Sequence, residues 1–448
     1  MKKHNSLFSR TTAPRKAKQT ALLPEEISIT GLSHEARGVA KHNGKTLFIA
    51  GALPGERVKF EIKKQHRRFD EADCTDVIEA SPDRAEPICE HYADCGGCDL
   101  QHLKHEKQIE SKQRQVLDQL ARLGKFQPTE ILPPLTSKDR NYRRSCRLGI
   151  NQLIRDGRPI VGFRRKSSHK LLQIDNCPVL AEPLNNILRA LPSVLATENN
   201  FKEITHAELS YGDTEGAMTL RVKKTPAPQL TAKLQQLAET NGFRLYFDNG
   251  QQITAYAGEA KLTYQHAKTG STLGFQPGDF IQVNAAVNDA IVDRALDWLD
   301  PKHADRILDL FSGIGNFTLP IATLAGSVVG VEGVDEMVHR AGENARTANL
   351  NNCEFYRADL SQDLRALPWY KQGFNKALLD PPRTGALEVI KQLKQHNIQS
   401  LLYVSCNPAA LARDGAELVK QGYSASKFCV ADMFPHTSHV ESLILFQK

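Results

Sequence analysis

The chain has 448 residues, of which 24% are charged and 40% hydrophobic, and a net charge of +7. That length suffices for two or three domains that each bury a core, and the absence of any run of 18 apolar residues argues against a membrane-spanning helix. The first residues lack the apolar stretch of a signal peptide, so we expect a cytoplasmic protein. Its nine cysteines then argue against disulfides and for metal ligation or chemistry at a few of them.

Residues 1–24 form a basic segment with no acidic residue before Glu25. Its cationic residues are Lys2, Lys3, Arg10, Arg15, Lys16 and Lys18. Such a segment suits a polyanionic partner, although a flexible solvated leader has the same composition. The sequence alone leaves both interpretations open.

Residues 25–82 contain short apolar runs separated by turns, which predicts a small OB-like β-barrel. The expected strands are 27–29, 38–40, 46–49, 58–62 and 74–78, with turns at His42-Asn43-Gly44 and Pro54-Gly55. A group of cations follows Val58: Lys59, Lys63, Lys64, His66, Arg67 and Arg68. This density fits a surface that faces RNA phosphates, and it fits an ordinary solvated strand and turn equally well.

Residues 83–275 are predicted to form a central α+β domain, in which a helix over 104–123 is followed by strands. Arginines alternate with aromatic residues in two stretches, Tyr142 to Arg147 and Phe163 to Lys166. Unstacked RNA bases stack on aromatic rings and guanidinium planes, so this pattern favours RNA as a partner.

Four cysteines of this region have the spacing of metal ligands. Cys89, Cys95 and Cys98 are separated by five and two residues, and Cys177 precedes a proline far downstream. Thiols this close together indicate a metal site more than free core thiols, but their spacing fits zinc and an iron–sulfur cluster equally. The set differs from the Cys-x3-Cys-x2-Cys signature of radical adenosylmethionine enzymes. The metal is therefore expected to be structural or to position RNA.

From residue 276 to 448, strand-like runs alternate with helical patterns, which predicts a doubly wound, Rossmann-like parallel sheet. The expected strands are 305–311, 327–332, 353–356, 375–380, 400–405 and 441–446. Open sheets of this kind bind ligands at the carboxyl ends of their strands, so the residues there are the candidates for function.

The turn after the first of these strands, Asp309 to Thr318, contains Gly313 and Gly315. Glu332 ends the next strand, where an acid binds ribose hydroxyls. A dinucleotide site would need a third glycine and a basic phosphate cradle, so S-adenosylmethionine, a nucleoside cofactor without phosphates, fits better. Asp359, after the following strand, is expected beside the adenine, with a helix-capping aspartate as the alternative.

Cys406 follows the strand 400–405, in the run Ser405-Cys406-Asn407-Pro408. A thiolate is the side chain that adds most readily to an electron-poor carbon, and strand ends are where such sheets hold their ligands. Cys406 is therefore a candidate nucleophile, although most cysteines of a cytoplasmic chain are inert core residues.

Together these segments resemble the RNA uracil-C5 methyltransferase family, in particular its ribosomal members with a TRAM domain and an iron–sulfur cluster. The resemblance covers nearly the whole chain after residue 24. It is carried by the cysteine set and by six motifs: Phe280 to Asn284, Asp309 to Thr318, Val331 to Gly333, Asp380 to Arg383, Ser405 to Pro408 and His439 to Glu441. The transfer-RNA members look different, because they lack the barrel and the cysteine set.

The resemblance implies an S-adenosylmethionine-dependent enzyme that forms 5-methyluridine in 23S ribosomal RNA, at a site of the uracil-1939 type. It implies a [4Fe–4S] cluster on Cys89, Cys95, Cys98 and Cys177. It also implies cofactor binding by Gln282, Phe311, Asn316, Glu332, Asp359 and Asp380. The enzyme is expected to be a monomer without a DNA or membrane partner.

Uracil C5 is too weakly nucleophilic to take a methyl group directly, so the expected chemistry begins with addition of Cys406 to C6. The resulting enolate attacks the sulfonium methyl group from C5. By family position, Glu441 is then the base that removes the C5 proton, and Asp380 a hydrogen-bond partner of the uracil edge or the enolate. Without the resemblance, Glu441 would be interpreted as an exposed strand residue.

Two other functions fit the sequence. The first is methylation of another RNA group: a different uridine, a cytidine or an exocyclic amine. Arg383 argues against the amine, because amino-methyltransferases usually have an aromatic residue after Asp-Pro-Pro. The second is an RNA-binding assembly factor without catalysis, against which the intact Cys406 and Glu441 argue. His436 and His439 are expected to be solvated and receive no role, and Phe280 fits the core and the cofactor site equally.

Overall fold

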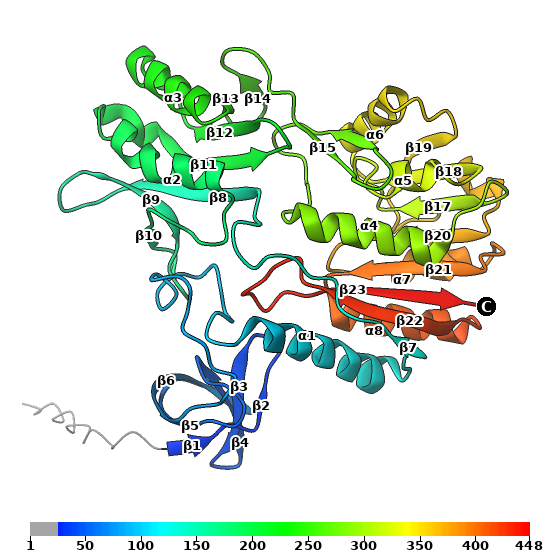
Figure 1. Ribbon diagram of the computed structural model, residues 1–448, viewed down its shortest axis with the longest axis horizontal. Coiled ribbons are helices and arrows are strands. Elements are labelled where there is room, and N and C mark those ends of the chain that lie inside the picture. Colours follow the sequence, from blue (N-terminus) through cyan, green and yellow to red (C-terminus); the bar gives the residue numbers. More distant parts are fainter. Residues whose placement is uncertain (1–25) are drawn as a thin grey trace, which may run out of the picture. The chain divides into compact units, whose positions relative to one another are not determined.

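The structure is a computed structural model that describes residues 26–448 (Figure 1). The predicted basic segment 1–24 lies outside these residues. The described chain divides into two compact units, 26–33 with 37–82, and 34–36 with 83–448. Among the helices of residues 26–448, none is long and apolar enough to cross a membrane.

The first unit is a six-stranded sheet in the order β1-β5-β6-β4-β3-β2. Its strands are β1 (Glu26–Ser28), β2 (Gly31–Leu32), β3 (Arg37–His42), β4 (Lys45–Ala50), β5 (Arg57–Gln65) and β6 (Phe69–Glu79). The two edge strands, β1 and β2, follow each other directly in the chain, so the sheet closes around its apolar core. This confirms the predicted barrel. Asn43 and Gly44 have positive φ in the β3–β4 turn, as a two-residue hairpin loop requires.

The second unit starts with the cysteine-containing segment and helix α1 (His105–Gln119), which continues as η1 (Leu120–Gly124). These two elements correspond to the helix predicted over 104–123. Ile109, Val116 and Leu120 pack into the core of the C-terminal sheet. Strand β7 (Glu130–Ile131) pairs in parallel with β22 of the same sheet. The segment 105–131, expected in the central domain, thus packs with the C-terminal sheet.

The central residues form a seven-stranded sheet in the order β10-β9-β8-β11-β12-β13-β14. The strands are β8 (Ser145–Gln152), β9 (Pro159–Arg164), β10 (Leu171–Gln173), β11 (Ile204–Tyr211), β12 (Gly216–Val222), β13 (Phe243–Asp248) and β14 (Ile253–Ala255). Helices α2 (Glu182–Leu195) and α3 (Pro228–Thr240) pack on this sheet, and η2 (Asn199–Glu203) precedes β11. The prediction missed both long helices, although leucines 184, 188, 191 and 195 repeat at helical spacing. A two-stranded ribbon, β15 (Thr263–Gln265) and β16 (Thr272–Gly274), follows.

The C-terminal sheet has eight strands in the order β19-β18-β17-β20-β21-β23-β22-β7. Its further strands are β17 (Arg306–Leu310), β18 (Ser327–Glu332), β19 (Cys353–Arg357), β20 (Lys376–Leu379), β21 (Ser400–Ser405), β22 (Ser424–Ala431) and β23 (Glu441–Gln447). The intervening helices are α4 (Ala285–Leu299), α5 (Thr318–Ala322), α6 (Asp335–Thr347), η3 (Trp369–Gln372), α7 (Leu387–Leu393) and α8 (Pro408–Lys420).

Alternate residues of each strand contribute to two separate apolar cores. Leu308 and Leu401 face a core with α1, α7 and α8, whereas Ile307 and Leu402 face one with α4 and α5. Helices therefore cover both faces of the sheet, which confirms the doubly wound, Rossmann-like fold.

The sequence had predicted a sheet that is parallel throughout, and this prediction is wrong for one strand. Strands β19, β18, β17, β20 and β21 are parallel, but β23 runs antiparallel to both β21 and β22. The connection from β22 to β23 is the loop 432–440, too short for a parallel crossover, so the chain returns as a hairpin (Figure 1).

Candidate active site

Three adjoining cavities lie at the carboxyl edge of the C-terminal sheet. The outer cavity, of about 880 Å³, is lined by Phe311, Glu332 and Asp359 among others. The central cavity, of about 500 Å³, shares Phe311 and Glu332 with it. The cysteine cavity, of about 520 Å³, contains the four predicted metal ligands. A ligand in the outer cavity can thus extend into the central one.

The central and cysteine cavities share the residues expected to perform the chemistry. The shared set is Phe280, Gln282, Arg383, Cys406 and Glu441. Asp380 also lines the central cavity. Cys406 and Glu441, the candidate nucleophile and base, therefore lie at the boundary of the two cavities. A molecule in the cysteine cavity would meet a ligand of the central cavity at these two side chains.

The turn after β17 is shaped by its backbone. Phe311, Gly313 and Gly315 have positive φ, which an L side chain rarely adopts, so the two glycines allow the chain to turn tightly at the cavity wall. Thr318, at the position where a dinucleotide site has glycine, donates a 2.5 Å hydrogen bond to the buried Asp309. Burial raises the pKa of Asp309 to about 7.

Glu332 closes this turn. One carboxylate oxygen accepts from Gly313 N (3.1 Å) and the other from Gly333 N (2.7 Å) and Val334 N (3.1 Å). Asp359 is exposed at the outer cavity, and its Oδ1 accepts from the Ser361 amide (3.0 Å) and hydroxyl (2.7 Å). Asp359 thus holds a turn and caps no helix, because residues 358–368 of the described chain contain none, and it also lines the cavity.

Asn316 lines the central cavity, but its amide is already held. Its oxygen accepts from Tyr264 Oη and Asn288 Nδ2, both at 3.1 Å, and its nitrogen donates to Asn288 Oδ1 at 2.9 Å. Gln282 is fixed through its backbone, because its carbonyl oxygen accepts from Arg144 Nε at 2.9 Å. No sequence pattern pointed to Tyr264 or Asn288, which come from separate elements, β15 and α4.

Cys406 stands between the end of β21 and the start of α8. Asn407 caps the helix, with its Oδ1 accepting from Ala409 N (3.1 Å) and Ala410 N (3.4 Å), and proline occupies the first helical position. Burial, followed by the nearby carboxyl groups of Glu441 and Asp380, raises the pKa of the half-buried Cys406 thiol to about 11, while Arg383 opposes this shift.

The Asp-Pro-Pro-Arg loop is tied to the nucleophile loop. Asn407 Nδ2 donates to the Arg383 carbonyl oxygen at 2.8 Å. Beyond it, Ala386 N donates to Asp414 Oδ2 (2.6 Å), which also accepts from Tyr403 Oη (2.7 Å). Burial raises the pKa of Asp380 to about 7. These contacts fix the separation of the two loops that carry Asp380 and Cys406.

Glu441 reaches the same edge because β23 is antiparallel. Ser442 pairs with Ser405, so the residue before the former and the residue after the latter lie at one end of the sheet. Glu441 is 7% exposed, and burial together with Asp380 raises its pKa well above its usual value. Glu441 is therefore buried beside the other site residues, unlike the exposed strand glutamate of the alternative interpretation.

The raised thiol pKa predicts how Cys406 reacts. In the RNA-free protein, alkylation of Cys406 by iodoacetamide should accelerate about tenfold per pH unit between pH 7 and 9, because only the thiolate reacts. Peptide mass spectrometry resolves Cys406 from the other cysteines. A rate that is flat over this range would contradict the assigned protonation state.

The cysteine cavity gathers all four predicted ligands: Cys89, Cys95, Cys98 and Cys177. Burial, and then the neighbouring thiols Cys177, Cys95 and Cys89, raise the pKa of Cys98 to about 12. A fifth, buried thiol, Cys146, lines the same cavity, as do Arg143 and Arg147. Four thiols around one space, with cations beside them, fit the donor set of a cysteine-bound metal group.

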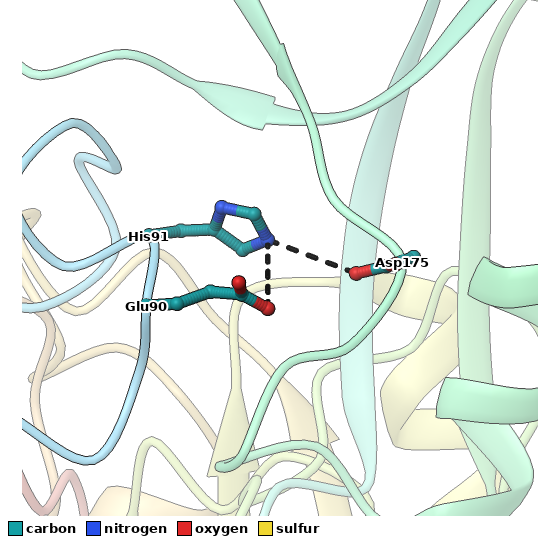
Figure 2. Close-up of side chains that lie close together, drawn as sticks. All are labelled: Glu90, His91 and Asp175. Carbon is teal, nitrogen blue, oxygen red and sulfur yellow. Dashed lines mark ion pairs between the residues drawn. The ribbon is translucent and has the colours of Figure 1, made fainter.

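Figure 2 shows one contact that brings the two cysteine-bearing segments together. The His91 ring lies 3.9 Å from a Glu90 oxygen and 3.8 Å from an Asp175 oxygen. Glu90 and Asp175 are exposed, and these groups lie beside Cys89 and Cys177 in the chain. The contact helps to place Cys177 next to ligands that are distant in sequence.

The arginines predicted to face RNA divide into two groups. Arg143 and Arg147 line the cysteine cavity, and their contact with RNA stays a prediction. Arg144 is 6% exposed, and its guanidinium lies 4.6 Å from the centre of the Tyr264 ring, so its assignment to an RNA surface is wrong. Tyr142 likewise points inward and donates to the Pro435 carbonyl oxygen at 3.1 Å.

Two residues without an assigned role have different surroundings. Phe280 is 67% exposed at the boundary of the central and cysteine cavities, which excludes a core position. His439 is exposed and lines the cysteine cavity, as solvation predicted, whereas His436 is buried, contrary to expectation. An exposed phenylalanine that lines the same cavities as the Cys406 thiol offers a flat surface for a nucleobase.

A basic hollow of about 460 Å³ opens on the central sheet. Its cations and histidines are Arg164, His169, Lys202, His206 and Lys223. No acidic residue is among its lining residues, all of which belong to the described chain. Such a hollow suits a phosphate-bearing ligand.

Comparison with known proteins gives the following matches. The family model described as tRNA (Uracil-5-)-methyltransferase matches residues 104–448, and that of the TRAM domain matches residues 25–74. The 23S rRNA (uracil(1939)-C(5))-methyltransferase RlmD of Alcanivorax borkumensis is 42% identical over 97% of this chain and 99% of its own. The protein of the same name from Alkalilimnicola ehrlichii is 43% identical over 95% and 97%, respectively.

Among solved structures, the tRNA (uracil-54, C5)-methyltransferase of Pyrococcus abyssi, in complex with S-adenosyl-L-homocysteine, superposes with a TM-score of 0.72. It covers 94% of this chain and 100% of its own, at 23% sequence identity. That likeness establishes the fold.

Proposed function

The chain belongs to the tRNA (uracil-5-)-methyltransferase family and is an S-adenosylmethionine-dependent RNA uracil-C5 methyltransferase, and from this premise we propose that its substrate is a uridine of 23S ribosomal RNA. The curated relatives that cover nearly its whole length are named for uracil 1939 of that RNA, so we propose a site of this type. A TRAM domain at residues 25–74 precedes the methyltransferase part of this chain.

One observation carries the catalytic proposal: Cys406 and Glu441 line a cavity together, between the cysteine set and the cofactor-side residues. We propose that the Cys406 thiolate forms a bond to uracil C6 and that the electron pair moves to an enolate. C5 then attacks the sulfonium methyl group, and S-adenosylhomocysteine leaves. Glu441 takes the C5 proton, after which the bond between sulfur and C6 breaks and the uracil ring regains its double bond.

Asp380 is proposed to hydrogen-bond the uracil edge or the enolate. Its raised pKa supports this role, since a carboxyl group that is protonated near neutral pH can donate to a developing negative charge. Phe311, Glu332 and Asp359 are proposed to bind the nucleoside part of S-adenosylmethionine in the outer cavity. Asn316 and Gln282 would border its amino-acid part in the central cavity.

We further propose that Cys89, Cys95, Cys98 and Cys177 hold a [4Fe–4S] cluster with a structural role. Protein purified without air should be brown and carry about four irons per chain. Cys98→Ala should lose the iron, whereas Cys146→Ala, at the fifth thiol of the same cavity, should retain it. Iron and zinc analysis checks both variants. Stoichiometric zinc without iron in the unaltered protein would reverse the assignment.

The substrate assignment has one specific competitor, a uridine of transfer RNA, because the matching family model is named for that substrate. Purified enzyme should be given 23S ribosomal RNA and transfer RNA separately, each with S-adenosylmethionine. The proposal expects 5-methyluridine, identified by nucleoside mass spectrometry, in the ribosomal RNA. Methylation of transfer RNA alone would favour the competitor, and a methylated cytidine or amine would overturn the uracil assignment.

The basic hollow and the cavity-lining Arg143 and Arg147 are proposed to contact the RNA backbone near the reacting base. The division into residues 25–82, 83–275 and 276–448, the monomeric state and the lack of a DNA partner stay predictions. So does the cytoplasmic location.

A further inference from the structure

The loop 432–440 leads directly into Glu441, and several of its contacts come from residues 99–112. Asp99 N and Leu100 N both donate to the His436 carbonyl oxygen at 2.9 Å. The His436 amide donates to Gln108 Oε1, also at 2.9 Å. Ser438 Oγ donates to Asp99 Oδ2 at 3.2 Å. The loop before the candidate base is thus bound to the residues that follow Cys98.

Gln108 is the centre of this contact. It is fully buried on α1, and its Nε2 lies within hydrogen-bond distance of the Leu100 and Leu103 carbonyl oxygens (3.0 and 2.8 Å) and of His436 Nδ1 (3.2 Å). One side chain therefore joins the cysteine segment, helix α1 and the loop before β23. Figure 1 shows this loop beside the start of α1.

A buried ion pair holds the first part of the loop. Lys112 Nζ lies 2.7 Å from Asp432 Oδ1 and donates to the Phe434 carbonyl oxygen at 3.1 Å. His105 lies 2.9 Å from the other Asp432 oxygen. Lys112 and Asp432 are 2% and 1% exposed, so separating them would leave a buried charge without its partner.

The loop needs these contacts, because His436 has φ +67°. A non-glycine residue in this left-handed conformation persists only where its surroundings hold it. His436 lies five residues before Glu441, the first residue of β23. The residues that hold its turn, Asp99, Leu100 and Gln108, follow Cys98 in the chain. A loosened His436 turn would let the start of β23, and with it the carboxyl group, move relative to Cys406.

From this geometry we infer that Gln108 and Asp99 are positioning residues, which couple the cysteine segment to the placement of Glu441 for proton removal. The inference rests on the proposed role of Glu441. It assigns the cysteine segment a part in one step of the reaction, the removal of the C5 proton. A metal group bound to Cys98 would restrict the motion of the adjacent Asp99.

Two variants test the coupling. Gln108→Met keeps the shape of the side chain and removes its hydrogen bonds, and Asp99→Ala removes the acceptor for Ser438. Each should form the covalent RNA adduct at nearly the unaltered rate but resolve it about tenfold more slowly, with unchanged KM for RNA, because buried hydrogen bonds that position a base affect only its step. Asp99→Asn keeps an acceptor oxygen and should restore resolution. Lys107→Met, on the exposed side of α1, is the control.

Hydrogen exchange gives a readout independent of activity. In both disruptive variants, amides of residues 432–441 should exchange faster than in the control, while those of β20 and β21 should not. Adduct resolution at the unaltered rate, or equal slowing of formation and resolution, would overturn the inference. The Glu441→Gln variant separates the role of Glu441 as base from its coupling to the cysteine segment. If Glu441→Gln traps no adduct, the role of Glu441 is refuted. If Glu441→Gln traps the adduct and Gln108→Met does not slow its resolution, only the coupling is refuted.

Discussion

Cys406→Ala should reduce methyl transfer by at least about 10⁴-fold, because without a thiolate at C6 the uracil C5 carbon does not become nucleophilic. Binding of S-adenosylmethionine should be nearly unchanged, since the variant leaves the proposed cofactor residues Phe311, Asn316, Glu332 and Asp359 in place. Single-turnover assays measure the first quantity and calorimetry the second.

Cys353→Ala provides the matched control for this experiment. Cys353 is a partly buried thiol of β19 in the same sheet and outside the three cavities. Its removal should leave methyl transfer intact. Substantial turnover by Cys406→Ala would refute the nucleophile, and loss of cofactor binding in that variant would point to a wider disturbance of the site.

Glu441→Gln should stall the reaction after methyl transfer. The glutamine side chain cannot take the C5 proton, so the bond between sulfur and C6 cannot break by elimination, and the enzyme should accumulate as a covalent complex with methylated RNA. Overall turnover should fall by roughly 10² to 10⁴-fold, the usual effect of a positioned general base. A denaturing gel with labelled RNA would show the complex as a slowly migrating band.

Glu417→Gln, on α8 of the same unit, should trap nothing and turn over normally. If Glu441→Gln behaves in the same way, the base lies elsewhere and Asp380, on the wall of the central cavity, is the next candidate. Adduct formation without methylation would instead place Glu441 before methyl transfer.

The direction of β23 shows what the sequence could and could not predict. Alternating apolar runs located this strand within one residue of its observed end, and they gave the Rossmann-like fold. They did not give its direction. In an all-parallel sheet, Glu441 at the start of its strand would lie at the edge opposite Cys406. Pairing of Ser442 with Ser405 reverses this, and such long-range pairing leaves no signal in local periodicity.

The sequence also could not predict which charged residues are buried. Arg144 and Arg147 are three residues apart in one basic stretch, yet the first packs against Tyr264 and the second lines the cysteine cavity. Composition treats them alike, because the difference arises only when the residue before β8 meets Tyr264 of the β15–β16 ribbon and the loop before α4. The same holds for Gln108, whose partner His436 lies 328 residues further along the chain.

The most direct test of the account uses RNA in which the target uridine carries fluorine at C5. After methyl transfer that carbon has no proton to lose, so the adduct cannot resolve, and the account predicts one RNA per enzyme bound through Cys406 with a methyl group on the uracil. Mass spectrometry of the digested complex would identify the modified peptide and the added mass. Absence of an adduct in the presence of S-adenosylmethionine, or an adduct on any other cysteine, would contradict the account.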